Sequence, residues 1–331
     1  MTPPGRWSAW ALAEAFQLAH AADFVVATDL LDGTERPVPA LASKADVDPG
    51  LLGALLELLA SRTDLVTRGP DGFRKGPGLG PIEEATIDQY VGAYGPNASS
   101  LAEILASPDR GRDLVDRDRH ATAFARAPGP GAVLLPDLLT RLELGNVLDL
   151  GCGTGELLVT LASGDSDFRG WGVDANPAMV ALAEERLRLG GAGDDQVRFY
   201  VGDVRDPARC APTGVLGDVA TVVAASLVNE FFHPDAVTAV RWLGDLRQAL
   251  PGRVLVVADY YGALGHMADP TPRRAVHDWI QLISGQGVPP PDLAGWEAVY
   301  VKAGCTLLHA VEDTDAGVFI HFVRLAQSDP S

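Results

Sequence analysis

The second half of the chain carries three acidic residues at or near the ends of apolar segments that resemble β-strands. Asp149 begins the glycine-rich run Asp149-Leu150-Gly151-Cys152-Gly153-Thr154-Gly155, and Asp174 and Asp203 lie at the ends of the next two segments. Glycines allow the backbone to approach a ligand closely because they carry no side chain. Carboxylates accept hydrogen bonds and attract positive charge. The pattern therefore predicts a site for a ligand with several hydrogen-bond donors and positive character.

The spacing of the glycines separates two classes of ligand. A dinucleotide-binding loop needs the pattern G-x-G-x-x-G, whereas here Gly155 comes one residue early and Glu156 takes the last place. A carboxylate beside a pyrophosphate is repulsive, which disfavours a NAD-dependent oxidoreductase. S-adenosylmethionine has no phosphate, and it carries an adenine, two ribose hydroxyls, an amino-acid head and a positive sulfur. We expect Asp174 to accept hydrogen bonds from the ribose hydroxyls, and Asp203 from the adenine amino group.

A parallel sheet must bring these residues together, and from Asn146 onward the sequence alternates between strand and helix patterns. We expect an α/β fold with a doubly wound, Rossmann-like sheet, in which ligands bind outside the carboxyl ends of the strands. The expected strands lie near residues 146–150, 169–174, 197–202, 218–226, 253–259, 305–311 and 318–325, with helices near 155–164, 177–189 and 234–250.

The first 75 residues have the element order of a winged helix. The pattern predicts two helices within 7–32, one helix over 38–47, one over 51–61, and two short strands within 65–74. Asp48 is a suitable N-cap for the helix over 51–61, with Pro49 in its first turn. Residues 51–60 contain one charged side chain, the acidic Glu57, and residues 1–75 contain seven basic and ten acidic residues. Helices that read DNA present side chains that bind phosphates and bases, and this helix does not. We therefore expect the winged helix to mediate dimerisation or to cover a substrate.

The composition limits the partners and the compartment. Hydrophobic residues make up 47% of the chain and charged residues 21%, and the net charge is −18. Such a surface repels phosphate backbones and anionic lipids, so we expect neither nucleic acid nor a membrane as a partner. The three cysteines are widely spaced and form no disulfide framework. No apolar run reaches the length of about 18 residues that a spanning helix needs. These features predict a cytoplasmic protein.

On the run from Asp149 to Gly155, with Asp174 and Asp203 at the following strand ends, residues 146–260 resemble the class I S-adenosylmethionine-dependent methyltransferases. The pattern of that family is D/E-x-G-x-G-x-G. The resemblance implies S-adenosylmethionine as the cofactor, with the glycines along its methionine part. The residues that we assign to the cofactor site are Asp149, Gly151, Cys152, Gly153, Gly155, Asp174, Ala175, Gly202, Asp203, Val204 and Ala225.

Nearly the whole chain resembles bacterial small-molecule methyltransferases related to the caffeate and hydroxyindole O-methyltransferases. In that group the N-terminal lobe mediates dimerisation and lines the acceptor pocket. The resemblance implies a winged-helix dimerisation domain over residues 1–80, a helical connector over 81–135 and a methyltransferase domain over 136–331. We interpret the charged run 110–120 within the connector as a solvated helix face. The expected partners are a small-molecule acceptor and a second copy of the chain.

The acceptor side departs from the pattern of the O-methyltransferases. They place a His-Asp pair after the fourth strand, where this chain has Asn229-Glu230. The departure resembles the C-methyltransferase branch, which includes 2-ketoarginine, phenylpyruvate and indole C3-methyltransferases. A carbon acceptor needs a base, and our candidates are Glu230 and His233. The alternatives are a structural hydrogen-bonding role for Glu230 and a helix N-cap at His233 before Pro234.

An aromatic acceptor, methylated at a carbon such as indole C3, fits the aromatic residues on this side. A 2-oxo acid, which favours an arginine clamp, and an O-methyl acceptor are the alternatives, and a winged-helix regulator that binds S-adenosylmethionine is an alternative of another class. We expect no metal, although His233, Asp235 and His277 could be written as an iron site. The residues that we assign to the acceptor are Asn229, Phe232, Tyr90, Tyr94, His277 and Trp279.

Overall fold

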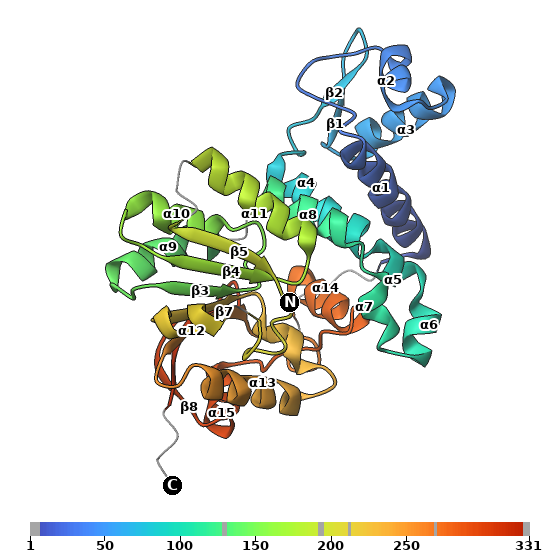
Figure 1. The fold of residues 1–331 in the computed structure, drawn as a ribbon. Coiled ribbons are helices and arrows are strands. Elements are labelled where there is room, and N and C mark those ends of the chain that lie inside the picture. Colours follow the sequence, from blue (N-terminus) through green and yellow to red (C-terminus); the bar gives the residue numbers. More distant parts are fainter. Residues whose placement is uncertain (1–6, 128–130, 191–194, 211–212, 268–269, 327–331) are drawn as a thin grey trace. The chain divides into compact units, whose positions relative to one another are not determined.

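The computed structural model describes residues 7–127, 131–190, 195–210, 213–267 and 270–326. The chain forms two compact units (Figure 1). The first combines Met1–Pro96 with Val115–Ala127, and the second combines Asn97–Leu114 with Pro128–Ser331. The expected connector, residues 81–135, is therefore divided between the two units. Within the described ranges, no helix combines the length and the apolarity that a membrane span requires.

The first unit is mainly helical. Its elements are α1 (Ala9–Ala27), α2 (Val38–Ala45), α3 (Pro49–Arg62), β1 (Val66–Arg68), β2 (Phe73–Lys75), α4 (Pro81–Ile87), the π-helix η1 (Asp88–Ala93) and α8 (Arg117–Arg126). The strands β1 and β2 pair antiparallel. Asp48 caps α3 by accepting a hydrogen bond from the Leu51 amide at 2.8 Å, as the sequence predicts. The prediction of two helices within 7–32 is wrong, because no glycine or proline interrupts the alanine-rich stretch of α1.

A buried ionic cluster lies inside the first unit. Asp88 is 1% exposed and forms ion pairs with Arg119 at 2.6 Å and with Arg126 at 2.7 Å. Arg119 also pairs with Asp23 at 2.6 Å. The interpretation of residues 110–120 as a solvated face is thus wrong for Arg119, whose charge is compensated by two carboxylates instead of by water. Sequence periodicity does not reveal such a partner, because Asp23 and Asp88 are distant along the chain.

The second unit is built on a seven-stranded sheet. The strands are β3 (Val147–Leu150), β4 (Gly170–Asp174), β5 (Val197–Val201), β6 (Thr221–Ala225), β7 (Val254–Tyr260), β8 (Cys305–Asp313) and β9 (Val318–Leu325). Their order is β5-β4-β3-β6-β7-β9-β8. The first five in this order are parallel, and β9 is antiparallel to both of its neighbours. The predicted fold class, a Rossmann-like sheet with a helical N-terminal region, is confirmed.

Helices cover both faces of this sheet (Figure 1). One face packs against α9 (Gly131–Arg141), α10 (Glu156–Gly164) and α11 (Pro177–Gly190). The opposite face packs against α13 (Ala236–Ala249) and α15 (Leu293–Lys302). Because successive strand residues point to opposite faces, a strand covered on both sides is apolar throughout, and β6 is buried from Thr221 to Ala224.

The remaining elements of the second unit are short, apart from α14. They are α5 (Gly95–Ser99, which spans the boundary between the units), α6 (Leu101–Ala106), α7 (Arg110–Leu114), α12 (Thr213–Asp218), the 3-10 helix η2 (Val228–Phe232) and α14 (Pro272–Ile283). Of these, η2 follows β6 directly, and α14 follows β7 after a loop. The 3-10 helix η2 therefore begins at the edge of the sheet where the parallel strands end.

Candidate functional site

The parallel register brings the ends of three strands to one edge of the sheet. Leu150, the last residue of β3, is level with Val173 of β4 and with Ala224 of β6. Gly151 follows at once, and a β-carbon on it would lie 3.2 Å from Cδ1 of Leu227, which follows β6. The glycine loop and the segment after β6 are therefore in contact, as the sequence analysis requires for a donor site beside an acceptor site.

The glycine loop adopts a conformation that depends on its glycines. Gly151, Gly153 and Gly155 have φ angles of +71°, +53° and +72°. A β-carbon on Gly155 would lie 2.6 Å from Cζ of Phe199 and 2.8 Å from Cβ of Ala183. At Gly153, by contrast, no atom lies within 4 Å of a β-carbon position. Gly155 is thus required by packing against α11 and β5, whereas Gly153 borders open space where a ligand has room.

Asp174 ties the end of β4 to this loop. Its Oδ2 accepts a hydrogen bond from the Gly153 amide at 3.0 Å, and its Oδ1 accepts one from the Asn176 amide at 2.8 Å. The side chain is partly exposed, and each carboxylate oxygen has capacity for a second hydrogen bond. Asp174 therefore orders the loop and still presents acceptor capacity, and Ala175 beside it is exposed.

Asp149 is the buried acid of the site. It is 3% exposed, and burial together with the nearby carboxylate of Asp174 raises its pKa to about 8. The same burial and the same two carboxylates raise the pKa of the Cys152 thiol. A cation placed in this surrounding would favour the ionised form of Asp149, so the site is electrostatically suited to a positively charged ligand.

The end of β5 contributes a third acid. Asp203 is about half exposed, and its Oδ1 accepts hydrogen bonds from Nε of Arg205 at 2.9 Å and from the Arg205 amide at 3.0 Å. Burial acts to raise its pKa, but these bonds and the charge of Arg205 outweigh burial and lower it. The neighbouring Gly202 donates its amide to the Asp174 carbonyl at 3.0 Å. Val204 is buried, and its carbonyl accepts from Nε1 of Trp242 at 2.7 Å.

The segment after β6 forms a second polar cluster. β6 ends at Ala225, and η2 presents Asn229, which is 4% exposed. The Asn229 amide donates to Oδ2 of Asp259 at 3.0 Å, and its side-chain Nδ2 donates to Oε1 of Gln281 at 3.2 Å. Asp259 is 6% exposed, and burial raises its pKa to about 7. Hydrogen bonds from the Asn229 and Tyr260 amides oppose this rise, and the carboxylate of Glu230 adds to it.

Asp259 and Gln281 are not among the residues predicted from the sequence. For Asp259 a signal exists, because it lies near the end of a parallel strand, as Asp149, Asp174 and Asp203 do. For Gln281 no comparable signal exists. Its burial at 5% exposure follows from the way α14 packs, and a glutamine in an amphipathic helix is ordinarily solvated.

The structure places the two candidate bases differently. Glu230 is partly exposed on η2 and close enough to Asp259 to raise the pKa of that acid. His233 follows η2, with Nε2 at 3.5 Å from Oδ1 of Asp109. The alternative reading of His233 as an N-cap is wrong, because Asp235 caps α13 by accepting from the Val237 amide at 2.8 Å. Catalytic roles for Glu230 and His233 stay predictions.

The predicted acceptor residues of the second unit lie on η2 and α14. Phe232 is buried and packs edge-on against Trp296, with ring centroids 5.1 Å apart. His277 lies edge-on to Tyr260 at 4.7 Å, and burial lowers its pKa, although the charge of the adjacent Asp278 opposes the change. Trp279 is 40% exposed.

Two further predicted acceptor residues, Tyr90 and Tyr94, belong to the first unit, where Tyr94 is buried beside His120. Asp278 is engaged elsewhere, because its Oδ2 accepts from the amides of Ala263 and Leu264 at 2.6 and 2.7 Å. In the part of the chain that the structure describes, no three His, Cys, Asp or Glu side chains are grouped as metal ligands.

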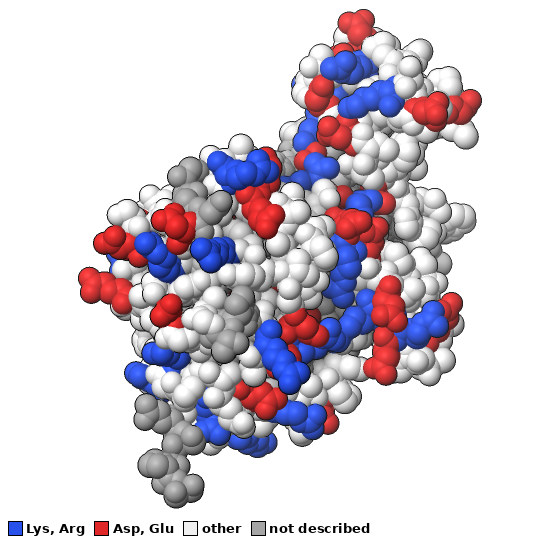
Figure 2. Space-filling view, in the orientation of Figure 1, with Lys and Arg blue, Asp and Glu red and all other residues white. Residues whose placement is uncertain are grey.

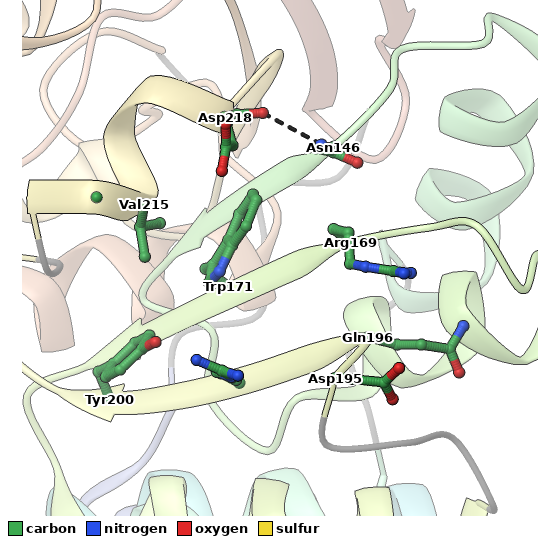
Figure 3. A pocket seen from close by; sticks show the side chains of 10 residues that line it. Asn146, Arg169, Trp171, Asp195, Gln196, Tyr200, Val215 and Asp218 are labelled. Atoms are coloured by element: carbon green, nitrogen blue, oxygen red, sulfur yellow. Dashed lines mark hydrogen bonds between the residues drawn. The ribbon is translucent and has the colours of Figure 1, made fainter.

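A cavity of about 530 Å³ lies elsewhere in the second unit, beside α12 (Figure 3). Asn146, Arg169 and Gln196, which line it, lie just before β3, β4 and β5, so the cavity is at the opposite edge of the sheet from the glycine loop. In Figure 3, Trp171 and Tyr200 project from neighbouring strands, and Asn146 donates to the Asp218 carbonyl at 3.2 Å. None of the predicted site residues lines this cavity.

The comparisons with known proteins concern mainly the second unit. A family model described as a methyltransferase domain matches residues 147–250. The magnesium-protoporphyrin O-methyltransferase of Rhodobacter capsulatus is 36% identical over 110 residues, which are 33% of this chain and 43% of that protein. The 2-ketoarginine methyltransferase of Streptomyces arginensis is 25% identical over 220 residues, which are 64% of this chain and 60% of that protein. The chain thus spans less than two thirds of the length of either relative.

A solved structure of similar fold covers nearly the whole chain. It is an O-methyltransferase from neocarzinostatin biosynthesis, in complex with S-adenosylmethionine and 2-hydroxy-5-methyl naphthoic acid. Its TM-score is 0.67 at 19% sequence identity, over 97% of this chain and 99% of that chain. At this identity the likeness concerns the fold, and it includes the helical N-terminal region as well as the sheet.

Proposed function

We propose that the chain, in which residues 147–250 match a methyltransferase domain, is a class I S-adenosylmethionine-dependent methyltransferase that transfers a methyl group to a small molecule of secondary metabolism. The observation that carries the proposal is the buried Asp149 beside the glycine loop. Burial and the carboxylate of Asp174 raise the pKa of Asp149, and a positively charged ligand beside it would favour the ionised form.

The residues at this edge fit the donor. Gly153 borders open space, and Asp174 holds the loop through the Gly153 amide while keeping acceptor capacity for hydroxyl groups. Asp203 is held by Arg205 at the end of the neighbouring strand, where its carboxylate suits an adenine amino group. S-adenosylmethionine supplies an electrophilic methyl group on a positive sulfur. The chain's own contribution is to hold donor and acceptor in line, which lowers a barrier by up to roughly 7–11 kcal/mol.

We propose a carbon of an aromatic ring, such as indole C3, as the acceptor atom. The acceptor carbon gains the methyl group, the sulfur keeps the electron pair of the broken bond, and the acceptor loses one proton to a base. Glu230 is our candidate for that base, because it is partly exposed beside the buried Asp259 and Asn229. The 2-ketoarginine methyltransferase among the relatives supports a 2-oxo acid as the competing acceptor.

We further propose that the protein is a homodimer formed through its first unit. Helix α1 carries aromatic side chains that are largely exposed, namely Trp10 at 86% and Phe16 at 61%, and Trp7 just before it is exposed at 65%. Exposed aromatic side chains are enriched at protein interfaces. On the face shown in Figure 2, acidic and basic side chains are interspersed, so that face has no continuous basic surface for nucleic acid.

Transfer of isotope-labelled methyl tests the proposed activity. The protein is incubated with methyl-labelled S-adenosylmethionine and, separately, with an indole, a phenol and a 2-oxo acid, and the products are located by mass spectrometry and NMR. We expect label on carbon with the indole, and a loss of about 10²–10⁴ in rate in Glu230→Gln. Label found on oxygen alone would refute the carbon assignment, and label in none of the products would refute the activity.

A further inference from the structure

The side-chain amide of Asn229 has one atom that the protein leaves without a partner. Asn229 is 4% exposed, and its Nδ2 donates to Oε1 of Gln281 at 3.2 Å. Its Oδ1 is buried and has no hydrogen-bond partner among the residues that the structure describes. Buried acceptors are nearly always paired in folded proteins. An exception at the edge of the sheet that binds the donor therefore points to a ligand.

Gln281 determines which atom of the Asn229 amide stays available. Gln281 is 5% exposed on α14 and presents its carbonyl oxygen to Asn229. Only the NH₂ group of Asn229 can donate to that oxygen, so the Asn229 carbonyl oxygen must face the other way. The backbone of Asn229 is fixed as well, because its amide donates to Asp259 at 3.0 Å. The orientation of Oδ1 is thus set by two separate elements, β7 and α14.

Asn229 belongs to the segment after β6, which is in contact with the glycine loop. Leu227, two residues earlier, is within contact distance of Gly151, where a β-carbon would lie 3.2 Å from its Cδ1. A second buried asparagine, Asn97, also has an unpartnered Oδ1. Its Nδ2, however, donates to the backbone carbonyls of Gly111 and Ile283 at 2.6 and 2.9 Å. Asn97 therefore joins two segments of the backbone and lies on α5, whereas Asn229 lies on η2, directly after β6 of the sheet.

We propose, on the basis of the proposed function, that Oδ1 of Asn229 accepts a hydrogen bond from an N–H group of the methyl acceptor, and that Gln281 is the residue that positions it. In an indole the ring N–H is conjugated with C3, and its nitrogen becomes more positive as C3 takes up the methyl group. An oriented carbonyl oxygen stabilises that charge. Being neutral, the Asn229 amide does not take up the proton, which leaves to a base.

The test compares acceptors that differ only in the N–H group. The two pairs are indole with 1-methylindole and L-tryptophan with 1-methyl-L-tryptophan, and kcat and KM are measured for wild type, Asn229→Leu, Gln281→Leu and Gln281→Glu. We expect wild type to prefer the N–H compound of a pair by roughly tenfold or more in kcat/KM, because a missing partner leaves a buried oxygen unpaired.

The variants separate positioning from folding. In Asn229→Leu the preference should fall to about twofold or less. Gln281→Leu should reduce both kcat and the preference for the N–H compound. Gln281→Glu keeps an oxygen toward Asn229, so it should retain most of kcat and most of that preference. Ser284→Ala is the matched control, because Ser284 is buried at the end of the same helix and its hydroxyl donates to the Ile280 and Gln281 carbonyls within that helix. It should leave the preference unchanged.

Binding of S-adenosylhomocysteine, measured by calorimetry, distinguishes failure of the inference about Asn229 from failure of the proposed methyltransferase function. Equal use of both compounds of each pair by wild type, or an undiminished preference in Asn229→Leu, overturns the inference. Transfer to none of the four compounds by a protein that binds S-adenosylhomocysteine also overturns it, while leaving the donor site in place. Failure of wild type to bind S-adenosylhomocysteine overturns the proposed function itself.

Discussion

Asp149 couples the candidate donor site to pH. Its pKa of about 8 lies above the ordinary value of 3.8, because the carboxyl is buried and Asp174 is close. A ligand with positive charge favours the ionised form, so binding below pH 8 must release a proton. The affinity should therefore rise with pH up to about 8 and then level off.

We predict that binding of S-adenosylmethionine, whose sulfur is positively charged, releases close to one proton at pH 7. Calorimetry in two buffers of different ionisation enthalpy measures this number. Asp149→Asn should abolish most of the release, whereas Asp137→Asn, an exposed acid paired with Arg141, should not alter it. An unchanged proton release in Asp149→Asn would show that another group titrates on binding.

The same pKa has a consequence for stability, with the opposite dependence on pH. Between pH 3.8 and about 8 the folded state binds more protons at Asp149 than the unfolded state does. The contribution of this group to the free energy of unfolding therefore falls as pH rises through that window. Asp149→Asn should remove this part of the slope when unfolding by denaturant is followed at several pH values.

For individual site residues, the position at the end of a strand can be predicted from the sequence, whereas burial on one side of a helix cannot. The sequence predicts Asp149, Asp174 and the glycines as neighbours because parallel strands end at one edge, and the Gly153–Asp174 hydrogen bond joins them. Asp259 follows the same rule, because it lies near the end of the parallel strand β7. Gln281 depends on the rotation of α14 against η2, which a helical pattern alone does not define.

The glycine loop is the element on which the site depends most, and its glycines have separable roles. Gly155→Ala would place a β-carbon 2.6 Å from Phe199 in a residue with a φ of +72°. Overpacking costs about 1–3 kcal/mol and left-handed backbone about 1–2 kcal/mol in such a residue. We predict a loss of a few kcal/mol in the free energy of unfolding, measured by urea denaturation.

Gly153→Ala serves as the matched comparison. It bears the left-handed backbone, with a φ of +53°, but its β-carbon meets no atom within 4 Å. It should therefore unfold at only slightly lower urea concentration and lose affinity for S-adenosylhomocysteine, because the methyl group occupies the space that the donor needs. Equal stability losses in the two variants would contradict this division of roles.

The order of the helices and strands can be predicted from the sequence, whereas the residues at which they begin and end are harder to predict. The sequence patterns predict all seven strands of the sheet. The central strands β3, β6 and β7 are the clearest, because strands covered on both faces are apolar almost throughout. The N-cap of α13 is Asp235 and not His233, since the polypeptide enters the helix two residues later than the motif suggested. Helix α1 is continuous because its expected break contains no residue that interrupts a helix.

For the whole molecule, the account predicts a dimer held by the first unit. Sedimentation equilibrium should give twice the mass of one chain. The double variant Trp10→Glu with Phe16→Glu should give one chain mass, because both side chains are largely exposed on α1 and a charge there opposes association. Val237→Glu, which alters an exposed apolar residue of the second unit, should leave the dimer intact. A wild-type protein that sediments as a monomer would refute this assignment.

Calorimetric titration with S-adenosylhomocysteine and with NAD is the most direct measurement of the central claim, which is that the glycine loop holds a methyl donor. The account predicts that wild type binds S-adenosylhomocysteine and not NAD. It also predicts that Asp174→Ala weakens binding at least tenfold, because the loop loses the Gly153 hydrogen bond and the ligand loses an acceptor. Tighter binding of NAD than of S-adenosylhomocysteine, or unchanged affinity in Asp174→Ala, would contradict it.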